Sequence, residues 1–200
     1  MTIEDQIKDI LRDTLGLEDD QEIKPSDSLI NDLDADSIDF LDILFHIEKK
    51  MGVKVDSTKF NISGFDVNDP EFVQDFKLTK SGAEKLQAAF PERKERYVEG
   101  TAMQSLFRSI TVYDFISLIR SKIISDYISL KEQREFDYNT IFSSFLLTEF
   151  GFGIIIKYLP ELKDDLKPGM SMTQIGDTYS KPQLDATLQK LLKDIKPPKL

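Results

Sequence analysis

The sequence predicts an all-α protein, and three features of the chain support this. Apolar residues recur at helical spacing in residues 2–16, between Asp36 and Gly52, and in residues 111–120. Thr2, Asp36 and Thr111 are suited to cap these three stretches. A glycine, Gly16 or Gly52, follows each of the first two stretches, where a helix commonly stops. We therefore expect three helices here.

The second predicted helix begins in an acidic segment. Asp36 is a good N-cap, and Asp39, three residues on, is a weaker capping-box partner. Ser37 falls in the first turn, where a hydroxyl faces water and backbone N–H groups are free. A phosphodiester on that oxygen would meet the positive end of the helix dipole. The position is therefore suited to an anionic modification.

The side chains of this helix are expected to form two stripes. The apolar stripe, which should face the core, consists of Ile38, Leu41, Leu44 or Phe45, and Ile47. The opposite stripe is polar and consists of Asp39, Asp42, His46 and Lys49. An amphipathic helix of this kind packs on a neighbour and keeps its polar stripe in water.

Charge and cysteine content restrict the function. The 200-residue chain has a formal net charge of −10 and no cysteine. Residues 1–60 hold sixteen acidic and seven basic residues, a net charge of −9, whereas residues 61–200 carry −1. Such a field attracts basic protein surfaces and works against nucleic-acid binding. Disulfides, thiolate catalysis and thiolate zinc sites are excluded, so any thiol must be added to the chain.

The segment around Ser37 matches a known pattern. The run Asp32-Leu33-x-x-Asp36-Ser37-Ile38-Asp39, followed by a helix, resembles the acyl carrier protein family, with Ser37 at the position of the serine that carries 4′-phosphopantetheine. Phe40-Leu41-Asp42-Ile43 with Phe45 more closely resembles the specialised carriers that deliver very long fatty chains to lipid A. The family usually has glycine at the position of Asp34. Either the loop before the serine is less tight than in the family, or Asp34 takes a positive φ angle, which Asp tolerates better than most residues.

The resemblance implies a fold and a division of the chain. It implies a four-helix acyl-carrier-like bundle in residues 1–125, in which the long loop of residues 17–36 joins the first two helices. An insertion at about residues 60–110 precedes the last helix. Residues 126–200 then form a small, mainly helical C-terminal domain of unknown role, which we expect to pack against the carrier or a dedicated partner.

The insertion resembles one found in a longer subset of bacterial carriers. The resemblance rests on Asp69-Pro70-Glu71-Phe72, on Leu78 to Gly82 and on Phe90-Pro91. A helix is predicted from Lys80 to Phe90, with Ser81 and Glu84 as its capping box and a stop before Pro91.

The resemblance also implies a function. A 4′-phosphopantetheine arm, taken from coenzyme A and attached to Ser37 between Asp36 and Ile38, would hold an acyl group as a thioester. The partners implied are a phosphopantetheinyl transferase and the synthases and acyltransferases of fatty-acid, lipid or polyketide biosynthesis, which have basic docking patches. The residues expected to dock them are Asp39, Asp42 and Glu48, together with Asp36. The residues expected to line an acyl pocket are Leu33, Leu41, Leu44, Phe45 and Ile47, together with Ile38.

Other chemistries find less support in the sequence. His46, the only histidine, lies nine residues after Ser37, on the order of 13 Å along a helix, too far to act as its general base. Asp32, Asp34 and Asp36 lack the glycine and terminal glutamate of a calcium loop, so no metal site is expected. We expect no enzyme. The alternative from another class is a carrier-shaped interaction module that is not phosphopantetheinylated.

The C-terminal region contains the most apolar stretch, residues 142–159. Its length approaches that of a membrane span, but its charges and glycines argue against insertion. We expect a buried helix broken at Gly151-Phe152-Gly153, or a tight hairpin there, ending at Pro160. Two helical stretches, residues 171–179 and 182–195, should follow; the second needs a packing partner for its leucines, and the pair lacks the basic side chains of a DNA-reading motif. The N-terminus has no basic or long apolar segment, so a cytoplasmic location is expected.

Overall fold

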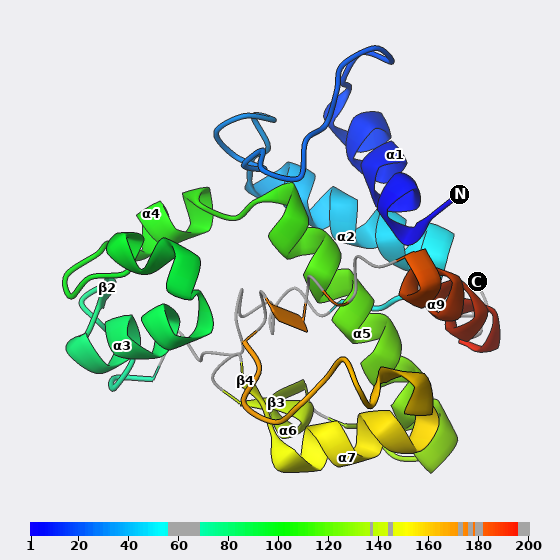
Figure 1. Cartoon of the computed structure of the whole chain (residues 1–200). Helices are drawn as coiled ribbons and strands as arrows, with labels where there is room; N and C mark the ends of the chain where they lie inside the picture. Colours follow the sequence, from blue (N-terminus) through cyan, green and yellow to red (C-terminus); the bar gives the residue numbers. More distant parts are fainter. Residues whose placement is uncertain are drawn as a thin grey trace. The chain divides into compact units, whose positions relative to one another are not determined.

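A computed structural model of the chain is mostly helical, which confirms the predicted all-α class (Figure 1). The structure describes residues 1–55, 69–136, 138–143, 146–171, 174–175, 178 and 182–195. Residue contacts divide the chain into two compact units. The first unit is Met1–Lys59, Arg108–Glu135 and Tyr179–Leu200, and the second is Phe60–Phe107 and Phe136–Thr178.

The first unit is built around helices from both ends of the chain and from its middle. These are α1 (Ile3–Leu15), α2 (Ser37–Met51), α5 (Val112–Glu132) and α9 (Pro182–Asp194). Helix α1 packs on α2, α5 and α9, and α5 packs on α9. The leucines of α9 that needed a partner therefore find it here: Leu184, Leu188 and Leu191 are buried. The predicted domain boundary near residue 125 stays a prediction.

Capping boxes begin three of these helices and pair Thr2 with Asp5, Asp36 with Asp39, and Thr111 with Asp114. The sequence predicts Thr2 and Thr111 as caps, and it predicts the complete pair of Asp36 and Asp39. Gly16 and Gly52 end α1 and α2 with left-handed φ angles of 62° and 72°. Only glycine adopts this region without strain, so both stops are fixed locally.

The long loop between α1 and α2 is tied to the start of α5. The amide of Leu29 donates to the Ile110 carbonyl at 3.1 Å, and the amide of Val112 donates to the Asp27 carbonyl at 2.8 Å. The Ser28 hydroxyl donates to the Arg108 carbonyl at 2.7 Å. These bonds and the buried side chains of the loop position the segment that leads into α2.

The second unit begins with a hairpin and a helix. Its first segment contains β1 (Val73–Gln74), β2 (Lys77–Leu78), α3 (Lys80–Ala89), a 3₁₀-helix η1 (Pro91–Arg96) and α4 (Met103–Arg108), whose last residue belongs to the first unit. The predicted capping box of Ser81 and Glu84 is wrong. Thr79 caps α3 and accepts from the amide of Gly82, because the helix starts directly after β2. The start of the predicted insertion, residues 60–68, lies outside the described residues.

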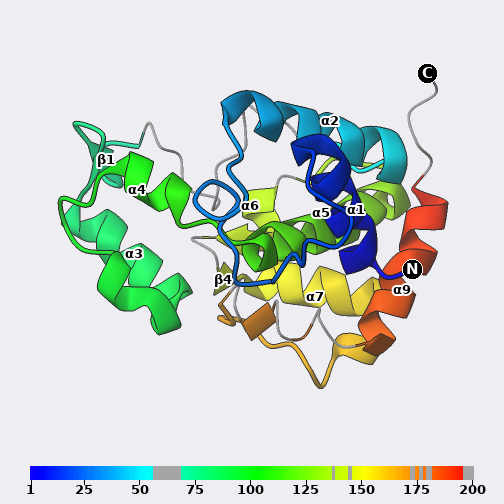
Figure 2. The ribbon, with the colours of Figure 1, turned by 90° about the horizontal axis from the view of Figure 1, so that it is seen from above.

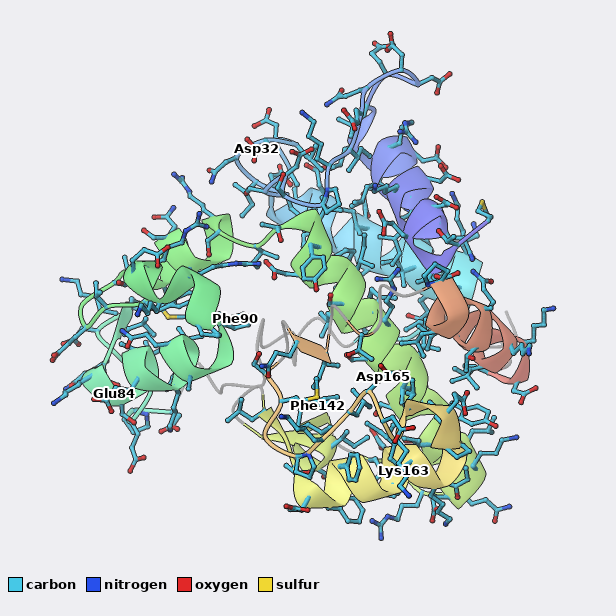
Figure 3. The ribbon with its side chains drawn as sticks, in the orientation of Figure 1. Asp32, Glu84, Phe90, Phe142, Lys163 and Asp165 are labelled. Carbon is cyan, nitrogen blue, oxygen red and sulfur yellow. The ribbon has the colours of Figure 1, made fainter. Side chains whose placement is uncertain are left out.

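The second segment of this unit contains α6 (Tyr138–Ile141), β3 (Phe142–Ser143), β4 (Leu146–Leu147), α7 (Glu149–Tyr158) and the 3₁₀-helix η2 (Pro160–Leu162); Figure 3 labels Phe142 and Lys163. The predicted break or hairpin at Gly151 to Gly153 is wrong, because α7 runs through both glycines. The hairpin lies earlier, at β3 and β4. No described helix is long and apolar enough to cross a membrane.

Candidate functional site

Ser37 is the first residue of α2. Its side chain lies outside what the structure describes, but the backbone around it is well defined by the cap. The Asp36 carboxylate accepts from the amides of Ile38 at 2.6 Å and Asp39 at 2.9 Å, and the Asp39 carboxylate accepts from the amide of Asp36 at 2.9 Å. The sequence leads us to expect free amides in this turn. The amides of Ile38 and Asp39 instead donate to the Asp36 carboxylate. What remains for an anion on Ser37 is the dipole of α2.

The loop before Ser37 takes one of the two forms that the sequence leaves open, the one with a positive φ angle at Asp34. Asp34 has a φ angle of 56°, in the left-handed region. Leu33 and Ala35 on either side of it are buried, and the amide of Ala35 donates to the Leu29 carbonyl at 2.9 Å. Asp32, labelled in Figure 3, accepts from the amide of Ser28 at 2.8 Å. The loop is thus anchored at several points and delivers Ser37 to the helix start.

Three large apolar side chains of α2 are exposed to solvent. Ile38, Leu41 and Phe45 are 67%, 51% and 57% exposed and share one face of the helix, which we name the α2 stripe. The opposite, buried face consists of Ile43, Leu44, Ile47 and Met51. These three side chains therefore do not face the core as expected, and their role in an acyl pocket stays a prediction. Leu33, Leu44 and Ile47 are buried, and their role in a pocket stays a prediction.

Acidic side chains flank the α2 stripe. Asp42 is exposed, and Asp39 and Glu48 are half-buried. The two capping amides, first that of Asp39 and then that of Ile38, lower the pKa of the Asp36 carboxyl, so it is an anion at neutral pH. The exposed face of α2 near Ser37 thus combines apolar area with negative charge, a combination that suits a partner surface with basic residues around an apolar centre.

His46 is held away from this chemistry. Its Nδ1 lies 3.2 Å from the Thr14 hydroxyl of α1, and its ring meets that of Phe45 edge-on. Within the described residues, no group of three His, Asp or Glu side chains is placed to hold a metal ion.

Comparisons with known proteins agree with this site. Residues 5–65 match the family model described as "Phosphopantetheine attachment site". An "Acyl carrier protein" of Nitratidesulfovibrio vulgaris (strain DP4) is 38% identical over 56 residues, which are 28% of this chain and 72% of that protein. The chain belongs to the acyl carrier protein family. The predicted prosthetic group, 4′-phosphopantetheine, is confirmed at the level of that family.

Two further proteins that are similar to this chain are named "Acyl carrier protein AcpXL". The protein of Rhizobium meliloti (strain 1021) is 45% identical over 51 residues, 26% of this chain and 53% of its own. The protein of Mesorhizobium japonicum is 36% identical over 85 residues, 42% of this chain and 87% of its own. Comparison with solved structures gives no significant match.

Sequence reasoning missed one feature of the site, the exposure of the α2 stripe. Helix α2 carries apolar residues on more than one face, so periodicity alone does not reveal which face packs. Phe40 shows the ambiguity: it is half-buried and its ring lies edge-on to that of Phe115, with ring centres 6.0 Å apart. The spacing of the apolar residues could have indicated this exposure. A helix with one buried face can fill it without Ile38, Leu41 and Phe45, which lie on a second face.

Proposed function

We propose that Ser37 is the attachment site of the 4′-phosphopantetheine arm and that the protein presents acyl groups to biosynthetic enzymes. The observation that carries this proposal is the position of Ser37: it starts α2 directly after the capping Asp36, within the segment matched by the phosphopantetheine model. When bound, the arm supplies a terminal thiol on which an acyl group is held as a thioester.

The residues around Ser37 fit this group. The N-terminal end of α2 carries the positive end of the helix dipole, which favours the negative charge of a phosphodiester. The carboxylates of Asp36 and Asp39 are already engaged with backbone amides, so they hold the helix start rather than compete for the arm. His46 lies within hydrogen-bond distance of Thr14 on α1, so we do not expect it to activate the Ser37 hydroxyl, and the transferase would supply that base.

The α2 stripe and its acidic neighbours are the proposed docking surface for the transferase and for synthases and acyltransferases. Asp39, Asp42 and Glu48 would meet basic patches on these enzymes, and contacts of this kind are weak and sensitive to salt. Such docking suits a shuttle that must be released. A non-catalytic role, a cytoplasmic location and a place in fatty-acid, lipid or polyketide biosynthesis belong to the same proposal.

The test is intact mass after incubation with coenzyme A and a broad-specificity phosphopantetheinyl transferase. We expect the wild-type chain to gain the mass of one arm and Ser37→Ala to gain none. Ser26→Ala, which removes an exposed serine of the preceding loop, is the matched control and should load like the wild type. If the wild-type chain stays unmodified while a known carrier is loaded, the alternative interaction module takes the place of this proposal.

A further inference from the structure

The second half of the chain repeats the order of elements found in its middle. The hairpin β1–β2, helix α3 and 3₁₀-helix η1 are followed by α4 and α5, and the hairpin β3–β4, helix α7 and 3₁₀-helix η2 are followed by α9. Most of the positions that correspond to α4 lie outside the described residues. The matching residues are 69 positions apart. Pairs that are identical include Leu78 and Leu147, Thr79 and Thr148, Gly82 and Gly151, Pro91 and Pro160, and Gly100 and Gly169.

The hydrogen bonds repeat at the same offset. The amide of Thr79 donates to the Phe72 carbonyl, and the amide of Thr148 donates to the Ile141 carbonyl, both at 3.0 Å. Each threonine hydroxyl then accepts from the amide three residues on, at 3.0 Å in the first copy and 2.8 Å in the second.

The return of the chain to the hairpin repeats as well. The amide of Gly100 donates to the Leu78 carbonyl at 2.9 Å, and the amide of Gly169 donates to the Leu147 carbonyl at 2.8 Å. These glycines have φ angles of 86° and 79°. Isolated bridges complete the match, pairing Lys77 with Ala102 and Leu146 with Ser171.

The helices that follow the two hairpin segments both belong to the first unit. Phe115 and Ile119 of α5 correspond to Leu184 and Leu188 of α9, and all four are buried. Figures 1 and 2 both show α9 beside the N-terminal end of α1.

Two corresponding residues reach the same end of α1. Arg120 of α5 lies 3.8 Å from the Glu4 carboxylate, and Gln189 of α9 donates to the Met1 carbonyl at 3.0 Å. Asp185 of α9 accepts from the amide of Ile3 at 2.9 Å and lies 3.8 Å from Arg120.

We propose that residues 69–126 and 138–195 are two copies of one module, and that α9, the closing helix of the second copy, completes the first unit by holding the N-terminal end of α1. The Asp185 carboxylate satisfies a backbone amide in the first turn of α1, where the helix itself supplies no partner. It also offsets the charge of Arg120, which is only 3% exposed. The C-terminal helix α9 is thus a structural part of the first unit, and this role does not depend on whether Ser37 is modified.

Asp185→Ala in the full chain tests the role of α9. Because a buried charge loses a partner, we expect the melting temperature to fall by on the order of 10 °C. We also expect the Ile3 amide to exchange with solvent at least tenfold faster, while the Asp5 amide, capped by Thr2, changes less. Asp194→Ala is the control. Asp194 lies on the same helix as Asp185 and pairs at the surface with Lys131 of α5, so its loss should shift the melting temperature by about 1 °C. If Asp185→Ala matches this control in both measurements, the role of α9 is refuted.

A graft tests the duplication. Residues 142–160 replace residues 73–91 in the full chain, and a second graft takes residues 143–161, one position out of register. We expect the first graft to keep the helical circular dichroism and a cooperative thermal transition. The shifted graft moves the threonine cap and the glycine and should lose the transition. Equal behaviour of the two grafts would overturn the duplication.

Discussion

Asp34 holds the loop before α2 in the left-handed backbone region, with a φ angle of 56°. Most L-residues enter this region at a cost of roughly 1–2 kcal/mol, whereas glycine enters it freely. We therefore expect Asp34→Gly to raise the free energy of unfolding by up to about 1 kcal/mol and Asp34→Val to lower it by about 1–2 kcal/mol. Urea unfolding measures both changes. Equal stability of the two variants would contradict the importance of this angle.

The cap that Asp36 makes at the start of α2 depends on pH. The Asp36 carboxyl has a lowered pKa in the folded chain, so its contribution to stability is complete above the unfolded pKa, about 4, and is lost as the pH falls through the folded value. Asn keeps a capping oxygen but does not titrate there. We expect Asp36→Asn to lose less stability than the wild type between about pH 4 and pH 2, measured by urea unfolding. If the wild type and Asp36→Asn lose stability in parallel as the pH falls, titration of Asp36 is not the cause of the loss.

At the scale of residues, the sequence predicts features that depend on a few neighbours. The caps Thr2, Asp36 and Thr111 are of this kind, and so is the positive φ angle at Asp34, one of the two forms that the sequence leaves open. The capping of α3 is different, because the end of β2 decides where that helix starts, and Thr79 is then its N-cap instead of Ser81.

Helix α2 has a packing face and an exposed face, and substitutions should separate their roles. Ile47 is fully buried, so Ile47→Ala is expected to lower the free energy of unfolding by about 2–5 kcal/mol. Leu41→Ala with Phe45→Ala removes exposed side chains and should lower it by less than about 1 kcal/mol, while slowing arm transfer several-fold. Chemical unfolding and loading kinetics give the two readouts. Normal loading by the double variant would exclude the stripe from docking.

The charge of α2 has its own test. Asp39 takes part in the cap, so Asp42 is the cleaner position at which to reverse a charge. Asp42→Lys should slow loading several-fold at low ionic strength and much less at high ionic strength. Asp20→Lys changes the net charge equally in the exposed loop before α2 and is the control. If both variants slow loading to the same extent, net charge rather than docking on α2 is responsible.

Helix α7 contains two glycines in different surroundings. A Cβ atom at Gly151 would lie 2.1 Å from the Ile141 carbonyl oxygen, whereas one at Gly153 would meet nothing within 4 Å. Gly151→Ala is therefore expected to lower the free energy of unfolding by about 1–3 kcal/mol. Gly153→Ala should raise it by about 0.5–1 kcal/mol, because alanine favours the helix. Thermal unfolding compares the pair, and a gain from both substitutions would contradict the close contact.

These glycines also explain why the sequence misplaces the turn in this region. Gly151 is present because a carbonyl approaches α7 closely, and a contact with Ile141 leaves no mark on local periodicity. The hairpins that do form have strands of two residues, too short for an alternating pattern.

For the whole molecule, helical periodicity predicts the fold class and the acidic motif around Ser37 predicts the family, because both are local features of the sequence. The course of the chain after α5 is not predictable in this way. The leucines of α9 indicate that this helix packs on another element. Only the tertiary structure identifies that element as α1 and α5, through their packing on α9 and the hydrogen bond from the Ile3 amide to Asp185. The repeat at 69 residues is faint in sequence because most of its surface positions differ.

Locating the added mass within the chain shows whether Ser37 carries the arm. After loading with coenzyme A and transferase, tandem mass spectrometry would fragment the peptide that spans Ser26, Ser28 and Ser37. If Ser37 carries the arm, every fragment containing Ser37 will carry the added mass, and fragments containing only Ser26 and Ser28 will not. An arm found on either of these two serines, or no arm at all, would contradict attachment at Ser37.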